Sequence, residues 1–321
     1  MSSFNDSQSM LELADTLGVS VSDQLSELTS LEFQEMKVID FLPEMMIMIR
    51  SLISKEGFTY QRKPITVIEK GLLISFQNMF KERKEATAET SQPLPEERPH
   101  VRITPSRMAS EVNFPKRSHI RQITILVEMR YLQQFLGRDQ SKFSPLFEAE
   151  NTFWIEEFMS PEIAVLVNEI VTAAPEGTLL DAYYRLKSLN LLYHLFKNLA
   201  YRQARPYCSM STAEMEAIYR VRNAMSTSLD QALTIAELVK LSGMNELKLR
   251  KLFKQVFGKG LYDYFQHLRM QEAARLLKEE RLSVSEAGYR LGFTNLSHFG
   301  RLFEACMGMK PKKWNTQNQQ G

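Results

Sequence analysis

The stretch GYRLGFTNLSHFGRLFEACMG, residues 288–308, decides the fold of the C-terminal part of the chain. An apolar helical rhythm enters this stretch, breaks at Gly292 and Phe293, and resumes after Thr294 until Gly308. A glycine at such a break lets the backbone end one helix and turn sharply. The stretch therefore predicts two helices joined by a tight turn, with Thr294 as the cap of the second helix.

Residues 234–258 repeat this arrangement with one residue fewer in the turn. Residues 234–237 and 283–286 both have the spacing of a capping box, which marks the start of a helix. A glycine follows each capping box at the same distance, and in this first copy Asn245 then caps the second helix. The second helices share an apolar i, i+3, i+4, i+7 spacing, carried by Leu249, Leu252, Phe253 and Val256 in one copy and by Phe299, Leu302, Phe303 and Cys306 in the other. The chain is thus expected to hold two helix–turn–helix units.

Residues 260–280 lie between the two copies and have an apolar helical face. This face consists of Leu261, Tyr264, Phe265, Leu268, Ala273, Leu276 and Leu277. A helix of about 20 residues is about 30 Å long, and one turn of B-DNA advances about 34 Å. The spacing therefore predicts a connecting rod that holds two recognition helices in successive major grooves of double-stranded DNA.

These residues together resemble the AraC/XylS family of bacterial transcription regulators, over about residues 218–314. The resemblance is carried by TIAELVKLSGMNELKLRKLFKQVFG from residue 234, by Arg269 with the apolar positions that follow it, and by VSEAGYRLGFTNLSHFGRLFEACMGMKP from residue 284. Residues 244–277 resemble the pyochelin-regulator-like subgroup, which implies an activator that responds to a ferric siderophore. The front of the chain, in which strands precede helices, is consistent with the barrel-plus-helices effector domain that many family members have.

The resemblance places the DNA contacts on the outward faces of the two second helices. The expected DNA-binding residues are Asn245, Glu246, Leu247, Arg250, Lys251 and Lys254 in the first copy and Asn295, Leu296, Ser297, His298 and Arg301 in the second. Arginine can form a paired contact with guanine, whereas lysine mainly neutralises phosphates. A helix start with its cap can bind a phosphate oxygen.

Three positions depart from the family pattern. Leu296 stands where a polar residue is usual, Gly300 replaces the common serine, and Trp314 replaces the usual tyrosine. A leucine neither donates nor accepts hydrogen bonds, so Leu296 either contacts a thymine methyl group or turns inward. Sequence reasoning leaves both options open.

The composition indicates a globular protein with an uneven charge distribution. The 321 residues have a net charge of +2 and 44% hydrophobic residues. From Ala213 onward there are 17 basic and 11 acidic residues, so the back of the chain is positive and the front is negative. This asymmetry favours a polyanionic partner for the back. Two cysteines, no signal peptide and no long apolar run predict a cytoplasmic protein without a membrane contact.

The front of the chain is expected to be α+β. Residues 1–30 are expected to be flexible, residues 31–205 to form an effector-binding or dimerisation domain, and residues 212–316 to form the DNA-binding domain. Between residues 31 and 128, short apolar runs at 36–41, 45–53, 65–76, 99–105 and 120–128 predict strands. These strands are expected to form a β-barrel or sandwich of the cupin-like type, followed by helices. In the helix expected near residues 179–200, we place Leu186, Leu189, Leu192, Tyr193 and Phe196 on one packed face, with a dimer seam as the alternative.

The sequence as a whole predicts a ligand-responsive DNA-binding transcription regulator, with RNA polymerase as a partner and homodimer formation as an option. A catalytic or metal-binding front domain is the alternative, and an architectural helical protein is a third reading. His100, His119 and His194 are scattered, Cys208 falls in the linker, and His298 has no second ligand nearby in sequence. We therefore expect no catalytic residues, no metal and no cofactor, and the effector and its contacts are not specified by these patterns.

Overall fold

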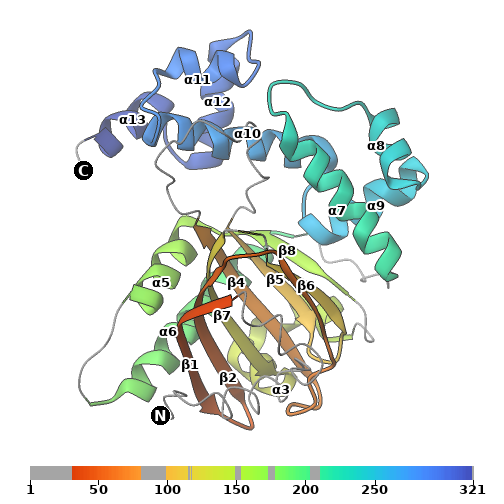
Figure 1. Ribbon diagram of the computed structural model, residues 1–321, viewed down its shortest axis with the longest axis vertical. Coiled ribbons are helices and arrows are strands. Elements are labelled where there is room, and N and C mark those ends of the chain that lie inside the picture. The colour runs from red at the N-terminus through yellow and green to blue at the C-terminus, as the bar shows by residue number, and fades with distance from the viewer. Residues whose placement is uncertain are drawn as a thin grey trace. The chain divides into compact units, whose positions relative to one another are not determined.

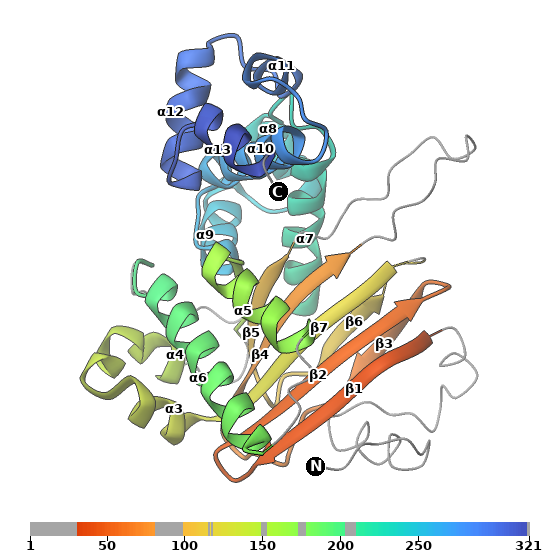
Figure 2. The same ribbon diagram turned by 90° about the vertical axis from the view of Figure 1, so that its left-hand side faces the viewer.

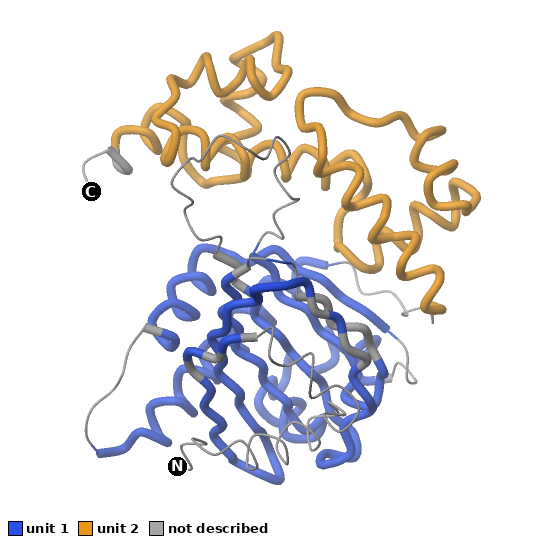
Figure 3. Tube along the Cα trace, viewed as in Figure 1, with its two compact units in different colours: residues 1–209 blue, residues 210–321 orange. Residues whose placement is uncertain are grey.

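The computed structural model describes residues 31–80, 99–114, 116, 118–148, 153–172, 178–202 and 210–319. The chain divides into two compact units, Met1–Ser209 and Met210–Gly321 (Figure 3). The segment 1–30, which was expected to be flexible, lies outside the described residues, as does Cys208 in the expected linker. No helix within the described ranges combines the length and the apolar character that crossing a membrane requires.

Strands dominate the first unit (Figure 1). They are β1 Leu31–Phe41, β2 Met45–Ser54, β3 Phe58–Arg62, β4 Gly71–Phe80, β5 His100–Pro105, β6 Ser110–Phe114, β7 Ser118–Glu128 and β8 Ile155–Phe158. One sheet has the order β1-β2-β7-β4-β5-β8, and β3 pairs with β6 in a separate two-stranded sheet. All of these pairs are antiparallel.

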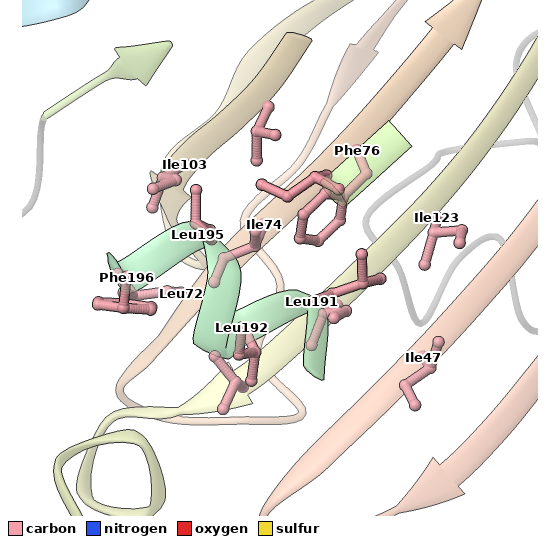
Figure 4. Packing of buried hydrophobic residues seen from close by; sticks show 14 of the residues in the cluster. Ile47, Leu72, Ile74, Phe76, Ile103, Ile123, Leu191, Leu192, Leu195 and Phe196 are labelled. Atoms are coloured by element: carbon pink, nitrogen blue, oxygen red, sulfur yellow. The ribbon is translucent and has the colours of Figure 1, made fainter. Parts of the chain in front are cut away.

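Helices cover one face of the six-stranded sheet (Figure 2). They are α3 Met129–Leu136, the 3-10 helix η1 Gly137–Phe143, α4 Ser144–Glu148, α5 Pro161–Thr172 and α6 Leu180–Leu199. Apolar side chains of α6, such as Leu191 and Leu195, pack on Ile74 and Phe76 of the central strands (Figure 4). Because these side chains are withdrawn from water, the face with the helices carries the hydrophobic core of this unit.

The opposite face of the same sheet carries a polar row in which Arg102 is half-buried and the other members are buried. Thr124, Ser75, Arg102 and Glu156 lie opposite one another on β7, β4, β5 and β8. The Ser75 and Thr124 hydroxyls are 3.3 Å apart, and the Arg102 guanidinium lies 4.6 Å from the centre of the Trp154 ring. Buried polar groups need hydrogen-bonding partners. The polar side chains make this face chemically distinct from the apolar face beneath the helices.

The α+β class is confirmed, but a closed cupin-like barrel is not. Among the described residues, the order of the sheet begins at β1 and ends at β8, so the sheet is open. The short strands β3, β6 and β8 were not predicted, because their sequences lack long apolar runs. Residues 65–70, which we had joined to the next strand, form a loop whose Ile65 and Ile68 pack on the polar-row side against Met46 and Met48.

The predicted packed face of α6 was wrong at two positions. Leu192 and Phe196 are buried, whereas Leu186 and Tyr193 remain 68% and 53% exposed. The buried face instead includes Leu191 and Leu195, because the sheet lies against adjacent residues of the helix as well as those one turn apart. A sequence rich in leucine on several sides of a helix does not indicate which side is buried.

The second unit consists of helices within the described residues (Figure 1). They are α7 Thr212–Thr227, α8 Ile235–Ser242, α9 Glu246–Phe257, α10 Leu261–Lys278, α11 Val284–Arg290, α12 Leu296–Met307 and α13 Pro311–Gln319. The predicted connecting helix is confirmed as α10, and every apolar position named for it is buried. Its 18 residues make it about 27 Å long.

Both predicted capping boxes are confirmed. The Thr234 hydroxyl accepts from the Glu237 N–H at 3.3 Å, and the Glu237 carboxylate accepts from the Thr234 N–H at 2.7 Å. Ser283 and Glu286 repeat these bonds at 3.2 and 2.8 Å. The backbone and hydroxyl of Thr234 lower the pKa of Glu237, and the hydroxyl and backbone of Ser283 lower the pKa of Glu286, from the usual 4.5.

These depressed pKa values predict acid sensitivity of the second unit. A carboxylate whose pKa is lower in the folded state stabilises the fold above its unfolded pKa and loses that contribution as the pH falls. We therefore expect the urea midpoint of the second unit to fall when the pH is lowered from 6 through about 4.5 and below. In Glu286→Gln, which can still cap but carries no charge, this pH dependence should be shallower. Equal slopes for the two proteins would contradict the assignment.

Candidate DNA interface

The first helix–turn–helix unit is formed by α8 and α9. Gly243 has a φ of +67° and its N–H donates to the Val239 carbonyl at 3.0 Å, which ends α8. The Asn245 side chain accepts from the Lys248 N–H at 2.9 Å and starts α9. Left-handed backbone at a helix end favours glycine, and asparagine is a preferred cap. This short turn places the polar side of α9 toward solvent.

The second helix–turn–helix unit, formed by α11 and α12, has a different turn. The Gly292 N–H donates to the Tyr289 carbonyl at 2.9 Å, and the Phe293 N–H donates to the Gly288 carbonyl at 3.0 Å. This pair of bonds is a Schellman motif, with Gly292 at a φ of +74°. The predicted cap Thr294 was wrong: Asn295 accepts from the His298 N–H at 3.0 Å. The extra residue lies between the Schellman motif and this cap.

The predicted core of α9 is confirmed, and that of α12 is confirmed at Phe299 and Phe303, whereas Leu302 and Cys306 are only half-buried. Leu249, Phe253, Phe299 and Phe303 are buried, and the two aromatic residues of α12 pack against each other with ring centres 6.0 Å apart. Helix α9 ends at Gly258 and α12 ends at Gly308, both in the left-handed conformation. The two copies are therefore alike in their core phase and in the way the helix ends.

The structure places nearly all of the predicted DNA-binding residues on the outward faces of α9 and α12. Those that are exposed are Asn245, Glu246, Leu247, Arg250, Lys251 and Lys254 on the first helix or its cap, and Asn295, Ser297, His298 and Arg301 on the second. Leu247 is 81% exposed, so its side chain is available on the outward face of α9. The two helices both contact α10 and belong to the same unit.

Leu296 is the exception among these residues. It is half-buried, and a methyl group added at Gly288 would lie 2.7 Å from the Leu296 Cδ2 atom. The side chain therefore lies over Gly288 of α11, where a larger residue would meet it. This geometry answers the question that the sequence left open, because Leu296 turns inward between the two helices of its unit.

Two ion pairs involve basic side chains of α9. The Arg250 Nε donates to Glu246 Oε1 at 2.7 Å, one helical turn away, and both side chains are about half exposed. Lys248 contacts Glu214 of α7 at 2.5 Å, and this lysine and the Ser211 backbone lower the pKa of Glu214. Exposed pairs of this kind contribute little to stability, so their main effect is on where the Arg250 and Lys248 side chains point.

His298 lies at the start of α12, with its ring centre 6.2 Å from that of Phe293. Within the described part of the chain, no three His, Cys, Asp or Glu side chains form a group suited to a metal ion. Cys306 contacts His267 at 3.0 Å, and burial raises the pKa of its thiol. A thiol with a raised pKa is poorly nucleophilic, so this pair is best understood as packing between α10 and α12.

Sequence reasoning gave Arg269 no structural role, although this residue is central to the second unit. Arg269 is 8% exposed and donates to the Leu291 carbonyl at the end of α11. Its guanidinium carbon lies 3.6 Å from the centre of the Phe293 ring. The available signal was the position of Arg269, four residues after Phe265 and four before Ala273, because a charged residue within an apolar helical face needs a buried partner.

Comparisons with known proteins agree with this geometry. Residues 238–317 match a family model described as "Helix-turn-helix domain". The chain is 25% identical over 171 residues to the arabinose operon regulatory protein of Salmonella typhimurium. This aligned segment covers 53% of the chain and 58% of that relative. It is 30% identical over 121 residues to the regulatory protein PchR of Pseudomonas aeruginosa, or 37% of the chain and 40% of PchR. The chain thus spans less than two thirds of each of these relatives.

Two solved structures have low TM-scores against this chain. A probable AraC family transcriptional regulator from Rhodopseudomonas palustris is 26% identical, with a TM-score of 0.30 over 32% of this chain and 97% of that chain. ToxT from Vibrio cholerae is 10% identical, with a TM-score of 0.31 over 85% of this chain and 98% of that chain.

Proposed function

We propose that this chain, whose C-terminal unit is a helix–turn–helix domain of the AraC/XylS type, is a sequence-specific DNA-binding regulator of transcription. The observation that carries this proposal is the pair of recognition helices, α9 and α12, each with exposed polar residues on its outward side. An α-helix fits the major groove, where side chains can distinguish the base pairs. Selection of binding sites from random DNA, followed by footprinting, tests the proposal. Recovery of no preferred sequence would contradict it.

Base recognition is assigned to the two exposed arginines. Arg250→Ala and Arg301→Ala should each weaken binding to the selected site by about 1–3 kcal/mol, because each removes a side chain able to pair with guanine. Binding to unrelated DNA should change less. Gel-shift titrations measure both affinities, and Lys278→Ala is the control, since Lys278 is an exposed basic residue of α10 outside the recognition helices. Unchanged affinity in both arginine variants would refute the assignment.

Lys254 and Lys251 are assigned to the phosphate backbone. Lys254→Ala should weaken binding to all sequences by a similar factor and should lower the slope of log affinity against log salt by about one. The same gel-shift series at several salt concentrations measures this slope. A loss confined to the selected site would instead make Lys254 a base contact.

The first unit is the proposed sensor for a small molecule. Support comes from its polar row, which includes Arg102 beside Trp154 and the neighbouring Glu156, whose carboxylate lies 3.9 Å from Arg102 Nη2. An aromatic ring and a cation favour a planar or anionic ligand. We include in the same proposal that the first unit is cupin-like and that its effector is a ferric siderophore. The proposal also includes activation through RNA polymerase and homodimer formation. A thermal-shift screen with ferric siderophores, sugars and aromatic acids tests the sensor, and the absence of any shift would count against it.

A DNA-binding domain fused to a catalytic or metal-binding unit is the second candidate. His100 and Glu156 are the observation in its favour, because their side chains approach within 3.8 Å in the first unit. A metal site in proteins generally requires three or four such ligands. Metal analysis of the purified protein distinguishes the two candidates, because a stoichiometric metal would favour the second.

A further inference from the structure

The turn of the second helix–turn–helix unit is fastened to α10 through Arg269. The Arg269 Nε donates to the Leu291 carbonyl at 3.1 Å, and Nη2 donates to the same oxygen. Nη1 donates to Gln266 at 3.2 Å, which keeps the guanidinium in place on its own helix. Leu291 carries one of the carbonyls at the end of α11 that lack a partner within the helix, and the helix dipole favours a cation there.

The same turn also contacts the loop that precedes the first helix–turn–helix unit. The backbone of Asp230, in the loop between α7 and α8, lies against Gly292: a methyl group added at Gly292 would be 2.1 Å from the Asp230 carbonyl oxygen. Asp230 also acts electrostatically on Arg269, opposing the fall in its pKa that burial causes. Three parts therefore meet at one place. They are the loop that leads into the first helix–turn–helix unit, the turn of the second helix–turn–helix unit, and the Arg269 side chain of α10.

We propose that Arg269 and Gly292 form a joint that fixes α12 relative to α9, so that the protein reads two DNA segments at one spacing. This inference rests on the proposed DNA-binding function. Apolar packing alone is non-directional and would let α11 and α12 shift along α10. Two N–H donors on one carbonyl, a stacked Phe293 ring and a backbone contact that tolerates no side chain are directional. Arg269 is thus a positioning residue and does not itself contact DNA.

A distance measurement in the full chain without DNA tests the joint. Spin labels on exposed Lys251 of α9 and Ala305 of α12, introduced as cysteines after Cys208→Ser and Cys306→Ser, report the separation of the two helices. We expect one narrow distance distribution in the parent protein and a clearly broader one in Arg269→Met. Arg269→Lys keeps the charge but loses the paired donors, so its distribution should lie between the other two. It also provides a variant if Arg269→Met fails to fold.

Phe303→Leu is the matched control for lost stability. This substitution weakens the core around α12, where Phe303 packs on Phe299 and Trp314, and it leaves the contacts of the Arg269 guanidinium in place. Its distance distribution should stay narrow. An equal broadening in Phe303→Leu and Arg269→Met, or a narrow distribution in both Arg269 variants, would overturn the joint.

Binding to spaced DNA tests the role of the joint in recognition. One base pair inserted between the two segments of the selected site should cost the parent protein about tenfold in affinity, equivalent to about 1.4 kcal/mol and comparable to the cost of one mismatched base pair. In Arg269→Lys this penalty should shrink to about threefold or less. An unchanged penalty would overturn the spacing role. If no preferred sequence is recovered at all, the DNA-binding proposal fails and so does the spacing role. If the selected site has a single segment, only the spacing role fails. The distance measurement decides in either case whether the joint exists.

Discussion

Gly292→Ala should destabilise the second unit by at least about 3 kcal/mol, the largest loss expected from a single methyl group in this chain. The left-handed backbone at a φ of +74° alone costs a residue with a Cβ atom about 1–2 kcal/mol. The new methyl group would also lie 2.1 Å from the Asp230 carbonyl oxygen, and backbone atoms cannot move aside as the end of a side chain can. The loop before α8 and the turn after α11 would have to separate.

Gly308→Ala is the matched control, because Gly308 has the same φ of +74° and no atom within 4 Å of an added methyl group. It should therefore show only the backbone cost of about 1–2 kcal/mol. Urea unfolding followed by Trp314 fluorescence, in a Trp154→Phe background that leaves Trp314 as the remaining tryptophan, measures both variants. If the two alanine variants unfold at the same urea concentration, Asp230 and Gly292 are not in close contact.

The second unit was largely predictable from sequence because its signals are local. A capping box, a glycine at a helix end and an apolar i, i+3, i+4, i+7 spacing each involve residues within a few turns of one another. This is why α8, α9, α10 and the core residues Phe253 and Phe299 were placed correctly. Thr294 was misassigned because Thr294 and Asn295 are both acceptable caps, and the choice depends on the Schellman motif that precedes them.

The contacts of Gly292 and Leu296 could not be predicted for a different reason. Gly292 looks like an ordinary helix end in the sequence, whereas its contact partner Asp230 lies in a loop far away in the chain. The inward turn of Leu296 depends on the absence of a side chain at Gly288 in the neighbouring helix. Such properties arise from tertiary packing, which overrides local patterns and leaves no local signal.

The strands of the first unit show the same limit. The long strands β2 and β7 have apolar runs and were predicted, whereas β8 consists of Ile155–Phe158 with two glutamates. Its Glu156 faces Arg102 across the ladder, so the strand is specified by a cross-strand partner as much as by its own composition. The open order of the sheet likewise follows from which strands pair, a property that no single segment carries.

Phe253→Ala should also be strongly destabilising, at about 3–5 kcal/mol. Phe253 is fully buried in α9, and its ring lies 4.6 Å from that of Phe257 and 5.2 Å from that of Tyr264 on α10. Truncation leaves a cavity at the contact between the first recognition helix and the connecting helix, and the stiff aromatic neighbours cannot collapse into it. Thermal unfolding followed by circular dichroism, with hydrogen exchange of α9, measures the loss.

Leu247→Ala separates this structural role of α9 from its recognition role. Leu247 lies on the same helix but is 81% exposed, so its truncation should change stability by less than about 0.5 kcal/mol. Under the proposed function this side chain contacts a base edge such as a thymine methyl group, so affinity for the selected DNA should fall while the melting temperature is unchanged. A joint loss of stability and affinity in Leu247→Ala would mean that the leucine is packed within the protein, and the outward face of α9 would have to be reassigned.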